Sequence, residues 1–360
     1  MSHFNVLVVG SQPEDQLAPF HEFECTDRND KYVQEVDITE KVRKEYEDQT
    51  EERLQDPEGN LHSFFDEKGD WRPEFSVVDE DDKPFFKGAK KRLKKFVPEG
   101  YTKVEVPTSQ IMSFLDYVLD MYEKPILAFE QEPDTNNVHR YGWVSVDEKG
   151  LVLKVVDRTN PNAKWDWYKL GGRWTGFFKL KSTADISVVG RPGLMTKLAK
   201  PGYADMALKS DIDFKSMRTE AAKEAGKKWD KIHQVIDPHI SNFMSWNVVL
   251  AKHDEENVKE AREEFHAQPL MKALQDNKLF LWDGVEPFLV KREDYAQEAY
   301  DTAIETFAVI KDGQWYQKGR MGWWACVSDE MDPEEWSKQF KELLDSLPET
   351  EIISVYDCHI

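Results

Sequence analysis

The sequence predicts an α+β fold, a mostly antiparallel sheet with helices on one face, which carries a large insertion or a second domain. Three observations lead to this prediction. The chain opens with a short apolar run, it closes with a β-β-α-β pattern, and charged segments without a sustained period separate the two ends. Short strands joined by one amphipathic helix are typical of a split βαβ, ferredoxin-like arrangement. In such an arrangement the first and last strands are antiparallel neighbours.

The two ends of the chain give the clearest local patterns. Residues 4–10 form a β-branched apolar run that ends at glycine, which predicts a buried strand. Near the other end, Asp332 and Pro333 supply an N-cap and a proline at the first helical position. Apolar residues then recur on one helical face until Pro348 stops the helix. Residues 352–360 close the chain as a second apolar strand.

The segments between the ends divide into regions of different character. Residues 35–55 are charged and predict an exposed helix, whereas residues 56–107 are rich in Pro, Gly, Asp and Lys and predict an irregular insertion. Further helices are expected over 108–122, 213–235 and 255–276, with a hairpin over 141–156. We therefore predict three regions: residues 1–30 together with 300–360 as a terminal α+β unit, 31–107 as a charged insertion, and 108–299 as a central α+β region.

Composition limits the classes of function. The chain has 360 residues, 40% of them hydrophobic, which is enough to bury a core. Lys and Arg number 48 against 69 Asp and Glu, so the formal charge of −21 makes nucleic-acid binding an unlikely function. No apolar run is long enough for a membrane helix, and the start lacks the pattern of a signal peptide. Cys25, Cys326 and Cys358 are too few and too widely spaced for a disulfide framework, so a reducing cytoplasm is expected.

Four segments are similar to those of a group of uncharacterised proteins from bacteriophages and bacteria. They are the MSHF start, the block of residues 164–174 (KWDWYKLGGRW) and the terminal DCHI of residues 357–360; Gly322-Trp323 and the segment that follows also match. The resemblance implies a phage-type protein that acts in the cytoplasm of the host bacterium, through host interaction or counter-defence. It implies no catalytic residue, because no activity is assigned to the group.

The first candidate site is the aromatic block itself. Tryptophans alternate with polar residues, two glycines permit a turn and the close approach of a ligand, and an arginine follows them. An arginine beside aromatic planes can hold a base, a phosphate or a carboxylate. The alternative is a hairpin with core tryptophans and an Arg173–Asp166 ion pair. The predicted ligand-binding residues are Trp165, Asp166, Trp167, Tyr168, Gly171, Gly172, Arg173 and Trp174.

The second candidate follows from pairing of the terminal strands, which would bring His3 close to Cys358 and His359, with His21 nearby. Imidazole and thiolate groups suit Zn²⁺ or a similar divalent metal, and a Cys–His pair also suits nucleophilic catalysis. The predicted metal ligands are His3, His21, Cys358 and His359. The alternative is an ordinary hydrogen-bonded cluster at the strand ends. The spacing matches no metal motif, so no cofactor is expected beyond this possible metal.

Three functions are compatible with these features. The first is a cytosolic binding protein that engages a nucleotide-like or anionic ligand, or a host protein, through the aromatic block. The second is a metal-dependent hydrolase with a His/Cys site at the paired ends. The third is an acidic decoy of a basic host protein. The chain lacks the phosphate-loop, nucleophile-elbow and zinc-protease motifs, and the sequence leaves catalytic turnover, catalytic residues and oligomeric state open.

Overall fold

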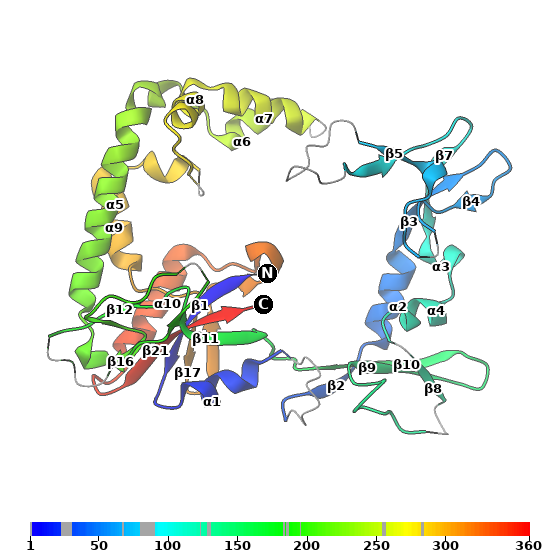
Figure 1. Cartoon of the computed structure of the whole chain (residues 1–360), viewed down its shortest axis with the longest axis horizontal. Helices are drawn as coiled ribbons and strands as arrows, with labels where there is room; N and C mark the ends of the chain where they lie inside the picture. Colours follow the sequence, from blue (N-terminus) through cyan, green and yellow to red (C-terminus); the bar gives the residue numbers. More distant parts are fainter. Residues whose placement is uncertain are drawn as a thin grey trace. The chain divides into compact units, whose positions relative to one another are not determined.

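The computed structural model describes residues 2–22, 31–66, 68–79, 91–122, 124–127, 131–182, 184, 187–194, 196–253, 257–281 and 284–360 (Figure 1). The chain forms two compact units. The first unit combines Met1–His21 with Lys164–Ile360, and the second is Glu22–Ala163. These boundaries correct the predicted ones. The predicted central region of residues 108–299 is divided between residues 163 and 164, and residues 31–107 belong with 108–163 in the second unit.

The first unit is built on a sheet in which the two ends of the chain are neighbours. Strand β1 (His3–Val9) pairs antiparallel with β21 (Ile352–His359), so that Val6 lies opposite Tyr356 and Leu7 opposite Val355. On its other edge β1 pairs with β17 (Ala308–Lys311), which forms a hairpin with β18 (Gln314–Gln317). The fold is α+β with mostly antiparallel pairing, and the pairing of the terminal strands is confirmed.

The remaining strands of this unit extend or flank the sheet. Strand β21 pairs along its other edge with β16 (Met206–Leu208) and with β11 (Trp167–Gly172), both antiparallel. The shorter strands are β12 (Phe178–Lys179), β13 (Ser187–Val188), β14 (Arg191–Pro192), β15 (Tyr203–Ala204), β19 (Arg320–Met321) and β20 (Val327–Ser328). β21 is thus the central strand that joins the first strand of the chain to the aromatic block.

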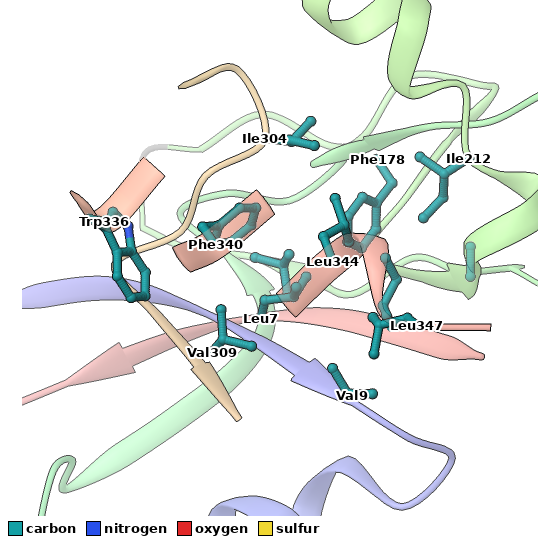
Figure 2. Close-up of a cluster of buried hydrophobic side chains, with 13 residues drawn as sticks. Leu7, Val9, Phe178, Ile212, Ile304, Val309, Trp336, Phe340, Leu344 and Leu347 are labelled. Atoms are coloured by element: carbon teal, nitrogen blue, oxygen red, sulfur yellow. The ribbon is translucent and has the colours of Figure 1, made fainter. Parts of the chain in front are cut away.

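Helix α10 (Pro333–Asp345) covers one face of this sheet. Asp332 caps it as predicted, because its carboxylate accepts hydrogen bonds from the backbone N–H groups of Glu334 and Glu335. Figure 2 shows Trp336, Phe340 and Leu344 of this helix packed against side chains of β1 and β17. The cluster consists of Leu7, Val9, Phe178, Ala207, Ile212, Ile304, Val309, Trp336, Phe340, Leu344, Leu347, Ile353 and Val355.

The opposite face of the sheet carries the alternate residues of the same strands. Short helices α1 (Pro13–Leu17) and η1 (Ala18–Phe20) pack there, which adds helical cover on a second face to the predicted arrangement. Their core cluster consists of Phe4, Val6, Val8, Leu17, Phe20, Trp165, Ala308, Ile310, Tyr356 and Cys358. The strict alternation of strand side chains therefore decides which residues near the chain ends can meet.

A helical subregion completes the first unit. The predicted helix over 213–235 is α5 (Phe214–Ile236), and it packs along α9 (Arg292–Thr302), with an Arg292–Asp230 ion pair of 2.7 Å between them. The other helices are α6 (Trp246–Leu250), α7 (Val258–Ala267), α8 (Pro269–Asp276), η3 (Lys209–Asp211), η4 (Asp237–Asn242), η6 (Glu286–Phe288) and η7 (Trp323–Ala325). Among the residues that the structure describes, no helix has both the length and the apolar character to cross a bilayer.

The second unit contains a four-stranded sheet covered by short helices. The strands follow the order β2 (Gln34–Asp37), β10 (Val152–Thr159), β9 (Gly142–Val146) and β8 (Pro125–Leu127). The helices are α2 (Thr39–Asp48), α3 (Thr108–Ile111) and α4 (Phe114–Leu119). The predicted helix over 108–122 is broken at Met112, which is extended, and Ser113 caps a new helix after it.

The region predicted to be irregular contains several strands. The predicted helix over 35–55 is also wrong at both of its ends, because β2 precedes α2 and β3 (Thr50–Gln55) follows it. The additional elements are β4 (Leu61–His62), η2 (Pro73–Phe75), β5 (Ser76–Val78), β6 (Leu93–Lys95) and β7 (Thr102–Pro107). A small core of Leu54, Phe64 and Phe75 supports them, so non-local packing overrides the weak strand pattern of this segment.

Candidate functional site

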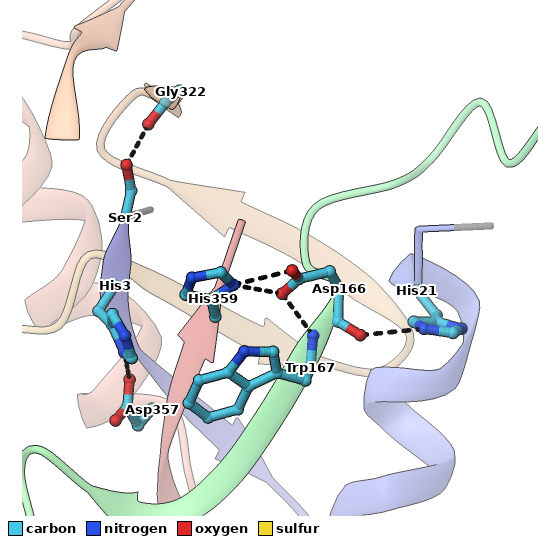
Figure 3. A network of polar contacts seen from close by, with 8 residues as sticks. All are labelled: Ser2, His3, His21, Asp166, Trp167, Gly322, Asp357 and His359. Atoms are coloured by element: carbon cyan, nitrogen blue, oxygen red, sulfur yellow. Dashed lines mark hydrogen bonds and ion pairs between the residues drawn. The ribbon is translucent and has the colours of Figure 1, made fainter. Parts of the chain in front are cut away.

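Three adjacent strands of the first unit bring two histidines and a tryptophan into one row. In the register of β1, β21 and β11, His3 lies opposite His359, which in turn lies opposite Trp167. Residues directly opposite each other in a sheet point to the same face, so these three side chains are neighbours. Figure 3 shows them together at the end of the sheet where β21 finishes. We call this cluster, with the aspartates that hold it, the terminal-strand site.

Each imidazole of this site is held by its own carboxylate. The Nδ1 atom of His3 donates to Oδ1 of Asp357 at 2.7 Å, and Nδ1 of His359 donates to Asp166 at 2.7 and 2.8 Å to the two oxygens. The side chains are largely buried, with exposed fractions of 11% for His3 and 7% for His359. A carboxylate at Nδ1 fixes the orientation and tautomer of the ring and leaves Nε2 as the reactive nitrogen.

The two rings and the indole contact one another directly. The imidazoles meet edge to face with 4.8 Å between centroids, and Trp167 stacks on His359 at 5.1 Å with an interplanar angle of 15°. Among the described residues, neither Nε2 of His3 nor Nε2 of His359 makes a hydrogen bond. Neither atom belongs to the polar side-chain atoms that are buried without a partner. Both Nε2 atoms therefore reach solvent, so the site presents two oriented imidazole nitrogens on one face.

The aspartate that holds His3 also orders the aromatic block. Asp357 is 1% exposed, and its second oxygen accepts a hydrogen bond of 2.8 Å from the backbone N–H of Arg173. Gly172 has a φ of +52°, and a Cβ at this position would lie 2.3 Å from the Cβ of Asp357. The glycine predicted to allow the approach of a ligand thus allows the approach of a carboxylate of the protein itself.

A second buried carboxylate, that of Asp205, approaches the preceding glycine in the same way. It is fully buried, and it accepts hydrogen bonds from the backbone N–H groups of Gly176, Phe177 and Gly190 and from the hydroxyl of Thr175. A Cβ on Gly171 would lie 2.5 Å from this carboxylate. Asp205 and Asp357 together fix the turn that follows β11, and so they fix the position of Arg173 relative to the imidazoles.

Two cationic residues follow Trp167 along the chain, one within β11 and one after its turn. Lys169 lies opposite Asp357 in the strand register, two residues from Trp167 and so on the same face as the imidazoles. Arg173 is exposed and follows the turn. Neither side chain has an ion pair with any residue that the structure describes, so both cations are available to a ligand. The predicted alternative of an Arg173–Asp166 ion pair is not formed, because Asp166 binds His359 instead.

Other members of the predicted ligand-binding block have packing roles. Trp165 is 5% exposed, and its indole N–H donates to the carbonyl of Leu17 at 3.2 Å within the core beneath α1. Tyr168 packs against the same core, and Trp174 packs against the core beneath α10. Of the aromatic residues in the block, Trp167 is the one with a large exposed fraction, 40%. The block therefore supplies both core residues and one edge of the terminal-strand site.

The four predicted metal ligands do not form one cluster. Cys358 faces away from His3 and His359, because it lies between Asp357 and His359 on a strand whose side chains alternate. It is fully buried, and burial together with the charges of Asp357 and Asp166 raises the pKa of its thiol. The ring of His21 contacts that of Trp165, with 4.6 Å between centroids and a tilt of 31°, and its Nε2 contacts the carbonyl of Asp166. No group of three or more His, Cys, Asp or Glu side chains among the described residues is placed to hold a metal ion.

Sequence reasoning assigned no role in the site to three residues that build it: Asp357, Asp205 and Lys169. The strand alternation gave a usable signal for two of them, since Asp357 shares a face with His359 and Lys169 shares one with Trp167. No pattern in the sequence pointed to Asp205, because its role depends on the path of a distant loop.

Comparison with known proteins identifies no relative. No protein-family model, no curated protein and no solved structure matches this chain. The function is therefore inferred from the geometry of the site.

Proposed function

We propose that the terminal-strand site binds a nucleotide-like ligand through its phosphate. One observation carries this proposal: two imidazoles lie side by side, each held at Nδ1 by a carboxylate, and each Nε2 reaches solvent. Because Nδ1 of each ring donates to its carboxylate, Nε2 carries a hydrogen only when the ring is an imidazolium. In that form the Nε2–H group donates to a phosphate oxygen, and two rings oriented in this way can bracket a phosphate. The carboxylates are occupied by these rings and by backbone N–H groups, which reduces their repulsion of an anion.

The neighbours of the imidazoles support the same ligand. Lys169 and Arg173 supply positive charge without a partner among the described residues, and a guanidinium matches the geometry of a phosphate. Trp167 is 40% exposed and provides an aromatic edge beside the imidazoles. An aromatic surface next to cations and imidazoles favours a ligand that has both a planar ring and a phosphate, which is the chemistry of a nucleotide.

The rest of the chain favours a small nucleotide over a long nucleic acid. The formal charge of −21 repels an extended phosphate backbone, whereas one or two phosphates can be held locally by Lys169 and Arg173. The resemblance to uncharacterised phage and bacterial proteins adds the proposal that the ligand belongs to the host cytoplasm, in a host-interaction or counter-defence role. A host protein is a separate proposal, to be tested by capture from a bacterial lysate.

Isothermal titration calorimetry with AMP and with inorganic phosphate tests the binding proposal. We expect AMP to bind, and we expect Arg173→Ala and His359→Gln to weaken it about tenfold or more, the loss of one charge-assisted contact. The matched control is Arg262→Ala, an exposed arginine of α7 in the helical subregion. Circular dichroism confirms that each variant is folded. Absence of AMP binding to the wild-type protein, or equal binding to Arg173→Ala, overturns the proposal.

A second function, acid–base cleavage of a phosphodiester, is favoured by the two His–Asp pairs. In this step a 2′-hydroxyl oxygen of a ribonucleotide attacks phosphorus, and its proton passes to Nε2 of one imidazole. The phosphorus–O5′ bond breaks, and the other ring, protonated at Nε2, gives its proton to the leaving oxygen. The aspartates stabilise the positive charge that each ring carries during the cycle. Proton exchange with water then restores both rings.

The probe for this second function is the dinucleotide uridylyl-adenosine, with its deoxy analogue as the comparison. We expect cleavage of the ribonucleotide with a bell-shaped pH dependence, and a loss of about 10²- to 10⁴-fold in His3→Gln and in His359→Gln. His266→Gln, in an exposed histidine of α7, is the matched control. If the deoxy compound is also cleaved, the nucleophile is water and not the 2′-hydroxyl. Parallel assays with EDTA and with added Zn²⁺ test the metal-dependent alternative.

The acidic decoy is a different proposal, since it requires no small ligand. Its test is the salt dependence of any complex with a basic protein, because attraction between opposite net charges weakens as salt is added.

A further inference from the structure

The helical subregion of the first unit contains a cavity of about 440 Å³ beside the end of α8 (Figure 1). Two of the residues that line it belong to the core of this subregion, namely Leu274, which is 5% exposed, and Val285, which is 2% exposed. Cavities of this size with an apolar lining are the usual form of a site for a small molecule. The buried and half-buried residues that line this one are all apolar or glycine, and the apolar ones are Met271, Leu274, Leu279, Leu281 and Val285.

The cavity is formed where the chain leaves α8. Lys278, two residues after the helix, adopts the left-handed conformation with a φ of 54°. Its backbone N–H donates to the carbonyl of Gln275, and the N–H of Leu279 donates to the carbonyl of Leu274, both at 2.9 Å. Such bonds close the end of a helix and turn the chain away from its axis. The segment that follows therefore lines the same cavity as the helix itself.

The polar side chains of the cavity lie at its mouth. Three polar residues line it, and all three are exposed: His266, Gln275 and Lys278. No described residue of the lining is an aspartate or a glutamate, although the chain contains 69 of them. Lys278 has no ion pair with any residue that the structure describes. The cavity thus combines an apolar interior with a positive charge at its entrance.

The backbone conformation of Lys278 gives a second indication of a role for its charge. Glycine is the usual residue at the left-handed position after a helix, because a Cβ is unfavourable there. Backbone strain of this kind is concentrated at ligand sites and other functional positions. A lysine in place of the usual glycine, at the mouth of an apolar cavity, is therefore accounted for by a ligand that carries a negative charge.

We propose that this cavity binds a fatty acid, whose hydrocarbon chain lies among the apolar residues and whose carboxylate lies at Lys278. The interior offers no polar side chain to a ligand, so polar groups in the body of the ligand would lose their hydrogen bonds to water without replacement. A carboxylate at the mouth instead forms a charge-assisted hydrogen bond with the ammonium group. The site uses no residue of the terminal-strand site, so it does not depend on the proposed function.

Isothermal titration calorimetry of the full chain with hexanoate, octanoate and decanoate tests the inference. We expect binding to tighten about threefold to fourfold for each added methylene, because each one is removed from water. Decan-1-ol has the longest of these chains without the charge and should bind about tenfold more weakly than decanoate. Lys278→Gln should weaken decanoate binding to the same extent and leave decan-1-ol binding unchanged. Lys272→Gln, in an exposed lysine of α8 that does not line the cavity, is the matched control.

Two further variants separate loss of binding from loss of folding. Lys278→Gly removes the charge together with the left-handed strain, so it should unfold at the same temperature as the wild-type protein or higher, yet bind decanoate about tenfold more weakly. Met271→Trp places a larger side chain in the cavity and should weaken the binding of both decanoate and decan-1-ol. Circular dichroism confirms that each variant is folded.

Three results would overturn the inference. The first is absence of decanoate binding to the wild-type protein, or full binding to folded Met271→Trp, since the cavity would then not be the site. The second is equal affinity for decanoate and decan-1-ol, unaffected by Lys278→Gln, since the ligand would then not be recognised as an acid. The third is loss of decanoate binding in Arg173→Ala, which would place the carboxylate in the turn after β11.

Discussion

His3 and His359 come from the first and last strands of the chain, and their imidazole rings meet edge to face with 4.8 Å between the ring centroids. The pairing of β1 with β21 is thus a condition for the terminal-strand site, because neither strand alone holds both rings. Asp357 adds a second condition, since the same carboxylate holds His3 and the backbone of Arg173. The stability of the sheet end and the geometry of the site therefore depend on the same few hydrogen bonds.

The substitution Asp357→Asn should destabilise the first unit. It removes a charge from two hydrogen bonds of a side chain that is 1% exposed, and bonds to charged groups contribute about 1.5–3 kcal/mol each. We expect a loss of about 2–3 kcal/mol in the free energy of unfolding, measured in urea. Asp312→Asn, in an exposed turn, is the control. Equal stability of the two variants would show that Asp357 contributes no more than a surface aspartate.

The substitution Gly172→Ala should cost more than Gly202→Ala, although both glycines have a positive φ. A methyl group at Gly172 would lie 2.3 Å from the Cβ of Asp357, whereas nothing lies within 4 Å of the corresponding position at Gly202. Backbone strain alone costs about 1 kcal/mol, and overpacking adds about 1–3 kcal/mol. Thermal unfolding of both variants measures the difference between their losses of stability. The two losses would be equal if the structure relaxed easily around the close approach to Asp357.

The architecture of the first unit was predictable where local signals are strong. Residues 4–10 and 352–360 are apolar and β-branched, so they could only be buried strands, and the Asp332-Pro333 start of α10 defines a helix by itself. The second unit was predicted poorly. Its strands are short and charged, as in β5 and β6, and they are stabilised by contacts with distant residues, which no local pattern reveals.

The candidate site was predictable in its location but not in its chemistry. Strand pairing places His3 beside His359, yet Cys358 and His359 are consecutive on one strand and must face opposite sides. That alternation was sufficient to exclude Cys358 from a site with the histidines. The partnership of His359 with Asp166 depends on the pairing of β11 with β21, which the sequence does not specify.

Acid should weaken the turn between β3 and β4 in the second unit. Hydrogen bonds from His62 and Asn60 lower the pKa of Asp56 to about 2, below its ordinary value of 3.8. A carboxylate whose pKa is lowered in the folded state stabilises that state when the pH is above the ordinary pKa of the group. For Asp56 this stabilisation is lost as the pH falls toward about 2. The stability difference between the wild-type protein and Asp56→Asn, measured by thermal unfolding from about pH 6 to about pH 2, should therefore shrink with acid. A constant difference would mean that the carboxylate charge has no role there.

Thiol chemistry should distinguish the two cysteines that the structure describes. Burial raises the pKa of Cys358, so its thiol stays protonated and inaccessible, whereas Cys326 is exposed in the loop between β19 and β20. The thiolate is the reactive form. We expect iodoacetamide at about pH 8 to alkylate Cys326 at least about tenfold faster than Cys358, as measured by peptide mass spectrometry, while Cys25 lies outside the described residues. Rapid labelling of Cys358 in the folded protein would show that the sheet end opens readily.

Replacing Ala325 by glycine should stabilise the protein, because this substitution relieves strain without removing a contact that the structure records for the side chain. The left-handed φ of 58° costs an L-residue roughly 1–2 kcal/mol, and glycine avoids most of that cost. Part of the gain in stability is offset, because glycine gives the unfolded chain greater conformational freedom. The hydrogen bond from the backbone N–H to Ser2 is retained. We expect a net gain of up to about 1 kcal/mol in urea unfolding. Ala251→Gly, at a residue with an ordinary φ of −64°, should instead lose stability. If both variants lose the same amount, the loop between β19 and β20 is not strained in solution.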